Sequence, residues 1–168
     1  MTLTASVTAA VVMEDTAALD LETVRSDLTK SIVRAFTNGT GNAKAQVKWS
    51  DRRIIAASGN EDLDLAAGLT DSFGRTITFT KIKALIIEAA SGNTNNVVVT
   101  RPGSNGVPIY AAAGDAHAIQ PNGVLIMCDP NAGVTVTPGT GDLINISNSA
   151  GGTGVTYDII IIGEGSVA

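Results

Sequence analysis

The chain has 168 residues, of which 44% are apolar and 16% charged, and its formal net charge is −5 at pH 7. This length suits a single domain, and the high apolar share excludes a disordered chain. The single cysteine, Cys128, excludes an intrachain disulfide. The longest apolar runs, such as Ile159–Ile162, are far shorter than the roughly 18 residues of a membrane-spanning helix, so no membrane partner is predicted.

The segment 25–53 carries an excess of positive charge on an otherwise acidic chain, because only Asp27 and Asp51 oppose its seven basic residues. A local basic surface on an acidic protein favours a protein partner over nucleic acid, since the remaining negative surface repels a polyanion. A merely solvated strand face is the alternative interpretation. The candidate partner-contact residues are Arg25, Lys30, Arg34, Lys44, Lys48, Arg52 and Arg53.

Residues 1–36 are predicted to form a strand or arm region that packs on the domain or on a neighbour. Thr2–Val12 alternates as a strand or an extended arm. Apolar residues of segment 21–36 recur at helical spacing, yet Thr29–Phe36 also alternates as a strand, and Asn38-Gly39 then offers a hairpin turn. We favour the strand. No basic residue precedes position 25, so a secretory signal is not expected and the chain should fold in a cytoplasm.

Residues 37–168 are predicted to form one β-sandwich domain. Apolar positions recur mostly with period two, and turn residues such as Pro121-Asn-Gly123 interrupt them at short intervals. Eight or more strands without βαβ alternation predict an all-β fold, an antiparallel β-sandwich of jelly-roll type. The predicted strands after residue 37 are 45–50, 53–57, 76–89, 97–100, 107–110, 124–128, 134–137, 143–147 and 155–162.

No catalytic constellation is predicted. His117 with Asp115 and Ser104 would be the strongest enzyme candidate, but no nucleophile elbow is present, and a lone histidine before a turn is typical of a strand end. Asp62 and Asp64 could form a carboxylate pair for glycoside chemistry, although capping and turn formation explain them more simply.

Metal, cofactor and nucleic-acid sites are not predicted either. One histidine and one cysteine cannot hold zinc, and the glycine-rich segments lack the lysine of a phosphate loop. Aromatic residues make up only 4% of the chain and are scattered, whereas stacking surfaces for sugars or single-stranded nucleic acid need several exposed rings on one face.

A series of short segments resembles, in order and spacing, a family of small virion proteins of tailed bacteriophages. The resemblance covers roughly residues 37–163. Its segments are Thr37–Gly41, Trp49–Arg53, Ala56–Ser58, Glu61–Leu65, Gly68–Gly74, Ile77–Phe79, Lys81–Lys83, Thr140–Asp142, Asn145, Asn148 and Val155–Gly163.

The resemblance implies a β-sandwich or jelly-roll subunit that decorates or cements an icosahedral capsid. The expected partners are the shell of the major capsid protein and further copies of the chain, as a dimer or trimer. The chain would be made in the host cytoplasm and located on the virion, and the family supplies no catalytic residues to transfer. The alternative is a receptor- or glycan-binding adhesin of the virion surface or tail, with loops such as Pro102–Tyr110 as its binding site.

Overall fold

The computed structural model describes residues 2–168, and this part of the chain forms thirteen strands and no helix. The predicted all-β, antiparallel sandwich is confirmed. The strands are β1 (Ala5–Ala18), β2 (Thr23–Asn38), β3 (Lys44–Ala45), β4 (Val47–Ile55), β5 (Asn60–Asp64), β6 (Leu69–Thr70), β7 (Thr76–Ala89), β8 (Val97–Thr100), β9 (Ala116–Ile119), β10 (Val124–Cys128), β11 (Val134–Thr135), β12 (Leu143–Asn148) and β13 (Val155–Val167).

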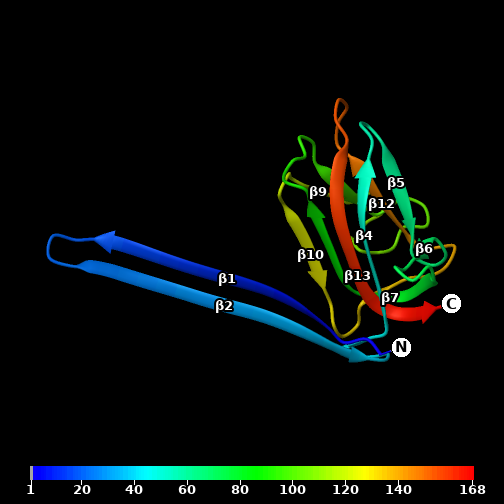
Figure 1. The fold of residues 1–168 in the computed structure, drawn as a ribbon, viewed down its shortest axis with the longest axis horizontal. Coiled ribbons are helices and arrows are strands. Elements are labelled where there is room, and N and C mark those ends of the chain that lie inside the picture. The colour runs from blue at the N-terminus through cyan, green and yellow to red at the C-terminus, as the bar shows by residue number, and fades with distance from the viewer. Residues whose placement is uncertain (1) are drawn as a thin grey trace.

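Eight strands build the body as two four-stranded layers (Figure 1). One layer has the order β10-β7-β13-β4 and the other β5-β12-β8-β9, while the short β6 and β11 add to β7. In each layer one of the last two strands lies between two earlier ones: β13 between β7 and β4, and β12 between β5 and β8. Eight antiparallel strands, with a chain that passes back and forth between the two layers in this order, have the connectivity of a jelly roll.

The main core lies between the two layers and is built by alternate side chains of each strand. Leu85 and Ile87 of β7 and Tyr157, Ile159 and Ile161 of β13 are buried in it, together with side chains of the opposite layer. Burial of each large apolar side chain stabilises the fold by about 1.5–3 kcal/mol. The alternation turns the intervening side chains of β7 and β13 to the outer face of their layer.

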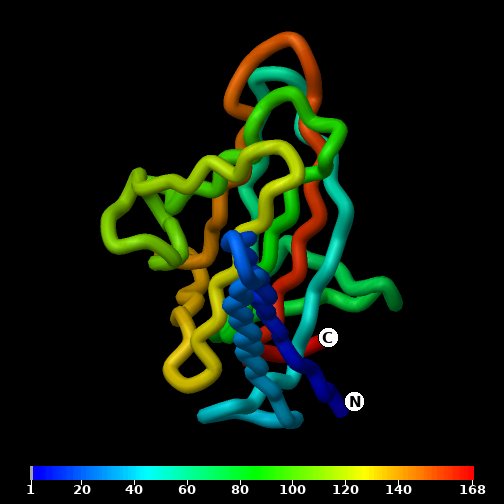
Figure 2. The backbone as a smooth tube through the Cα atoms, turned by 90° about the vertical axis from the view of Figure 1, so that its left-hand side faces the viewer, coloured from blue at the N-terminus to red at the C-terminus, as the bar shows by residue number. Residues whose placement is uncertain are grey.

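The N-terminal strands form a long two-stranded ribbon that projects from the body (Figure 1). We call residues 5–38 the arm. Its strands pair from Ala5↔Phe36 to Ala18↔Thr23, which makes it roughly 45 Å long at about 3.3 Å per residue. In Figure 2 the arm points towards the viewer, away from both layers. The strand favoured for Thr29–Phe36 is confirmed, and the helical alternative is wrong.

Two local predictions are wrong. Asn38-Gly39 makes no hairpin turn, because the chain loops round so that β2 pairs with β3 in parallel, with Thr37 opposite Lys44. Segment 107–110 forms no strand, although Val107 and Ile109 are buried in the main core. The alternation of apolar residues in this segment reflects burial of Val107 and Ile109 and not strand pairing. The amide of Ile109 donates to the nearby carbonyl of Val107 at 2.7 Å.

The last strand, β13, continues five residues beyond the predicted end at Ile162 and reaches Val167. Its pairing with β7 shifts register between Ile162 and Gly163 and again between Glu164 and Gly165, so β7 is bulged at Lys83 and Thr80, which have no partner on β13. A Cβ at Gly163 would collide with the carbonyl oxygen of Lys81. Glycine at this position therefore allows the close approach of the two central strands.

Candidate functional site

The arm has one face that is much more apolar than the other. Residues paired directly across two strands lie on the same face. The opposite face carries mainly serine, threonine and charged side chains. The apolar arm face consists of the pairs Ala5/Phe36, Val7/Arg34, Ala9/Ile32, Val11/Lys30, Met13/Leu28, Asp15/Ser26 and Ala17/Val24.

Most of this apolar face is uncovered. Within the two arm strands, only Val7 and Phe36 are buried and only Ala5 is partly buried. Leu21 in the turn at the tip is 99% exposed. An isolated two-stranded ribbon is marginally stable in water, and it leaves both backbone edges open to further pairing. Exposed apolar stripes of this kind are typical of surfaces that contact proteins, membranes or ligands.

The base of the arm is anchored in a second, smaller core. Phe36 is 1% exposed and packs with Val7 against Ala45, Ala84 and Ile162. The last two residues belong to the outer face of the β7 and β13 layer, opposite to the main core. The apolar arm face therefore begins as part of the body and continues into solvent.

A buried ion pair lies beside this anchor. Lys83 on β7 is 1% exposed and Glu164 on β13 is 6% exposed, and the Lys83 Nζ lies 3.1 Å from the Glu164 Oε1. The ammonium also donates to the carbonyl oxygens of Gly41 at 3.3 Å and Asn131 at 2.5 Å. The amide of Gly41 donates to the Glu164 Oε1 at 2.9 Å. The pair thus joins the two central strands to the loops that follow β2 and β10.

The protonation of Glu164 is set by competing effects. Burial opposes its ionisation, but the Gly41 amide, the Lys83 ammonium and the nearby Lys81 hold its pKa below the ordinary value of 4.5. Because the folded-state pKa is lowered, the pair stabilises the fold above the ordinary glutamate range. This contribution is lost as the pH falls through the lowered pKa.

The seven predicted partner-contact residues do not form one surface. Arg25, Lys30 and Arg34 are on the arm, Lys44 is on β3, and the other three are on β4. Several are already neutralised. Arg25 pairs with Glu14 and Asp27, Arg52 pairs with Asp158, and Arg53 pairs with Asp51 and Glu61. Among residues 2–168, Lys30, Arg34, Lys44 and Lys48 make no ion pair.

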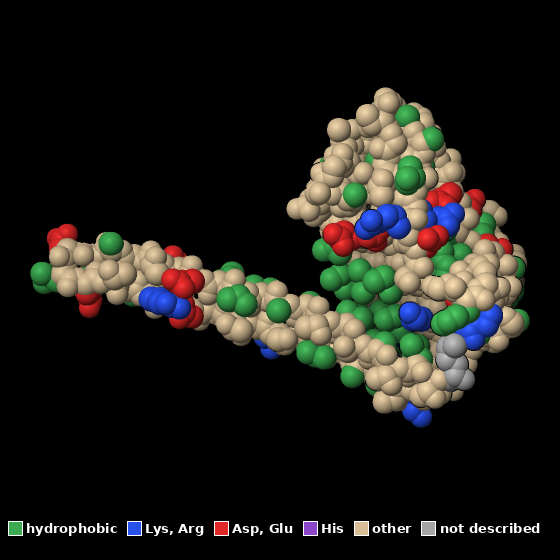
Figure 3. Space-filling model, in the orientation of Figure 1, with side chains coloured by type: hydrophobic (Ala, Val, Ile, Leu, Met, Phe, Trp, Pro, Cys, Tyr) green, Lys and Arg blue, Asp and Glu red, His purple; other side chains and the backbone are tan. Residues whose placement is uncertain are grey.

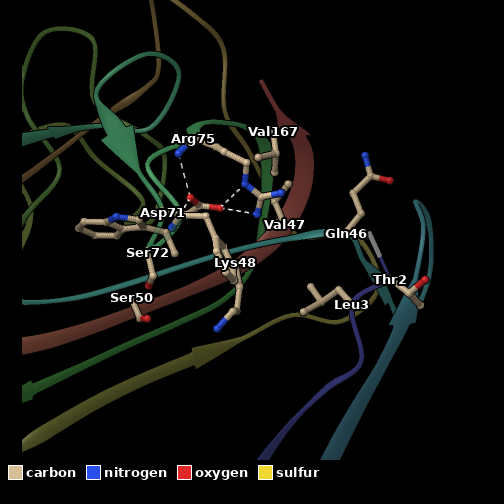
Figure 4. Close-up of a pocket in the computed structure, with 12 residues that line it drawn as sticks. Thr2, Leu3, Gln46, Val47, Lys48, Ser50, Asp71, Ser72, Arg75 and Val167 are labelled. Carbon is tan, nitrogen blue, oxygen red and sulfur yellow. Dashed lines mark hydrogen bonds and ion pairs between the residues drawn. The ribbon is translucent and has the colours of Figure 1, made fainter.

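A hollow of about 160 Å³ lies near the N-terminal segment, between the start of β4 and the loop that precedes β7 (Figure 4). Asp71 in its wall accepts hydrogen bonds from the Arg75 side chain at 2.9 and 2.5 Å. The guanidinium of Arg75 stacks 5.0 Å from the centre of the exposed Phe73 ring. Trp49 is buried and donates to the Thr70 carbonyl at 3.1 Å. The hollow therefore presents one exposed ring, which is less than a sugar-stacking surface needs.

The three aspartates considered for catalysis have structural partners. Asp115 accepts a hydrogen bond from the Ala112 amide at 2.8 Å, and His117 is exposed on β9. Asp64 caps a turn by accepting from two backbone amides at 2.9 and 3.0 Å, and Asp62 binds the amide group of Asn145 at 2.7 Å. Within residues 2–168 no group of three histidine, cysteine, aspartate or glutamate side chains could hold a metal ion.

Sequence reasoning missed Lys83 and Glu164 as a pair. The available signal was the position of each charge at the end of a strongly apolar run, Lys83 before Ala84–Ile87 and Glu164 after Ile159–Ile162. A charge at the edge of such a run is usually solvent-exposed. The two side chains meet because β7 and β13 are antiparallel neighbours and the register shift between Ile162 and Gly163 leaves Lys83 without a cross-strand partner close to Glu164.

The chain matches no protein-family model, and no curated protein matches it. Residues 2–168 include no helix long and apolar enough to cross a membrane.

Proposed function

We propose that the chain is a non-enzymatic structural protein of a tailed-phage virion, a decoration or cement subunit that binds and stabilises the mature capsid shell. The observation that carries the proposal is the exposed apolar arm face, because a ribbon of this length gains stability only when another protein covers it. The jelly-roll body and the resemblance of residues 37–163 to phage virion proteins support the same conclusion.

A subunit can cement a capsid because binding to one state of the shell stabilises that state. A subunit that bridges neighbouring units of the expanded shell binds the mature state better than its precursor, and this differential affinity stabilises the mature state. A projecting arm suits this role, since it extends the reach of each subunit across a gap between units. Several copies of one modest contact then add up through avidity.

The unpaired lysines at the base of the arm are the candidates for contact with an acidic shell. Lys44 and Lys48 are exposed and free of ion pairs among residues 2–168, whereas the Arg52 side chain is held by Asp158 at 2.6 and 2.7 Å. We therefore expect Lys44 and Lys48 to contribute more than Arg52 to a salt-dependent contact.

Cosedimentation of the purified chain with mature capsids that lack it tests the proposal. Lys44→Gln/Lys48→Gln should weaken binding at low salt and have less effect at high salt. Ser91→Glu/Ser104→Glu is the matched control, since it changes the net charge equally at exposed positions elsewhere. If the chain does not bind capsids under any salt condition, the decoration role is rejected. Saturable binding to glycans in place of capsids would support the adhesin.

A further inference from the structure

A second apolar surface lies on the outer face of the body. Ile126, Ile86 and Ile160 are direct cross-strand neighbours on β10, β7 and β13. Ile126 is 43% and Ile160 41% exposed, and Ile86 is partly buried. We call these three residues the outer-sheet patch. Figure 3 shows apolar side chains gathered on the body above the point where the arm leaves it, beneath a band of charged side chains.

The outer-sheet patch is bordered by an acidic row. Glu88 is paired in register with Asp158 and with Val124. Asp158 forms an ion pair with Arg52 on β4, whereas Glu88 makes no ion pair of its own among residues 2–168 and is only attracted by the nearby Arg52. On the other side, the row of Ala84 and Ile162 is already covered by the base of the chain's own arm.

The apolar arm face has a matching pattern. Lys30, paired with Val11, lies between the apolar pairs Ala9/Ile32 and Met13/Leu28. Successive pairs on one face of a ribbon are about 7 Å apart, which is also the spacing of successive rows on the sheet. An apolar pair of the arm can therefore lie on the patch while the neighbouring Lys30 lies over the row that contains Glu88.

Within one chain only the base of the arm reaches the patch, where Ile86 packs against the cluster that contains Val7 and Phe36. The arm leaves the body beside the covered row and runs away from the sheet (Figures 1 and 3). All arm-strand residues beyond the pair Val7/Arg34 are exposed, and so is Glu88. The arm face beyond Val7/Arg34 and the side chains of Ile126 and Ile160 remain exposed. The two surfaces are complementary in apolar character and in charge.

We propose that the apolar arm face of one copy packs on the outer-sheet patch of a second copy, with Lys30 facing Glu88. Packing two arms face to face is less favourable, because that face carries two basic residues, Lys30 and Arg34, and a single acidic one, Asp15. Because the two contacting surfaces differ, two copies can each place the arm on the other's patch and form a closed dimer. Alternatively, each copy can place its arm on the next copy around a symmetry axis and form a closed ring. This inference deepens the proposed function, on which it rests for the role of the arm in assembly.

The experiment is sedimentation of the purified full-length chain over a range of concentrations, with no capsid present. The wild type should self-associate reversibly. Lys30→Glu and Glu88→Lys should each weaken association by about tenfold or more, and the charge-swapped Lys30→Glu/Glu88→Lys should recover most of that loss. Both positions are exposed in the single chain, so circular dichroism should show unchanged folding of every variant.

Adjacent arm residues supply a matched control for the apolar contact. Met13 lies on the apolar arm face and Val12 on the opposite face, and both are exposed. Met13→Asp and Ile126→Asp should abolish association at concentrations where Val12→Asp retains it. A monomeric wild type at all concentrations overturns the inference, and so does loss of association in Met13→Asp with full association in Ile126→Asp.

The two proposals fail separately. A chain that stays monomeric alone but binds capsids refutes the arm exchange and leaves the decoration role intact. A chain that self-associates with the predicted charge-swap recovery but does not bind capsids supports the arm exchange and refutes the decoration role.

Discussion

The buried ion pair between Lys83 and Glu164 gives the sharpest stability prediction. Lys83→Met keeps most of the side-chain volume but removes the ammonium, which leaves the Glu164 carboxylate and two carbonyl oxygens, of Gly41 and Asn131, without this donor. Breaking a buried pair by removing one partner destabilises a protein by about 3–5 kcal/mol. For a chain of this size such a loss lowers the melting temperature by roughly 10 °C.

Urea unfolding measures the effect directly. Trp49 is the single tryptophan and is buried in the main core, so its fluorescence reports unfolding of the body. Lys48→Met is the matched control, because Lys48 lies on β4 of the same layer, is exposed and makes no ion pair among residues 2–168. The control should lose less than about 1 kcal/mol.

The double variant Lys83→Met/Glu164→Gln decides whether the cause is the unpaired charge. Replacing both partners removes the buried charge, so the double variant should be more stable than Lys83→Met alone. If Lys83→Met unfolds at the wild-type urea concentration, or if the two substitutions destabilise additively, the reasoning about this pair is wrong.

Three further predictions concern the acid range, the anchor and the arm. Because the pKa of Glu164 is lowered, its stabilising contribution to the fold is present above the ordinary value of 4.5 and is lost at lower pH. As the pH is lowered below that value, the urea midpoint of Glu164→Gln should therefore fall less steeply than that of the wild type. Parallel curves of midpoint against pH would contradict this. Phe36→Ala should lose about 3–5 kcal/mol in the same assay, whereas the exposed Val33→Ala should lose little; equal midpoints would show that the anchor does not support the body. Hydrogen exchange of arm amides beyond the base should be fast in dilute protein and slow in the associated state, and protection that does not depend on concentration would show that the arm is stable alone.

The body could be predicted from the sequence because its strands are strongly patterned. The residues of β7 were predicted with both ends correct, and β10 and the start of β13 likewise, since apolar runs and flanking turn residues define them. Segment 107–110 was misassigned because a buried loop can have the same apolar alternation as a strand. The extension of β13 to Val167 and the bulges of β7 opposite it depend on tertiary register, which no local pattern shows.

The arm could be predicted only in part. Alternation in segment 29–36 indicated a strand, but alternation reveals only that one face of a strand is apolar. It does not tell whether this face packs on its own body or on another molecule. The seven basic residues were grouped by their closeness in sequence, and the fold separates them because β2 carries three of them away from β4.

The most direct test of the account is an electron cryomicroscopy map of the purified virus particle that contains this polypeptide. The account predicts jelly-roll density on the outside of the capsid shell, with each arm in contact with a neighbouring protein along residues 8–33. Particles that lack the polypeptide, or subunits whose arms extend into solvent without any contact, would contradict it.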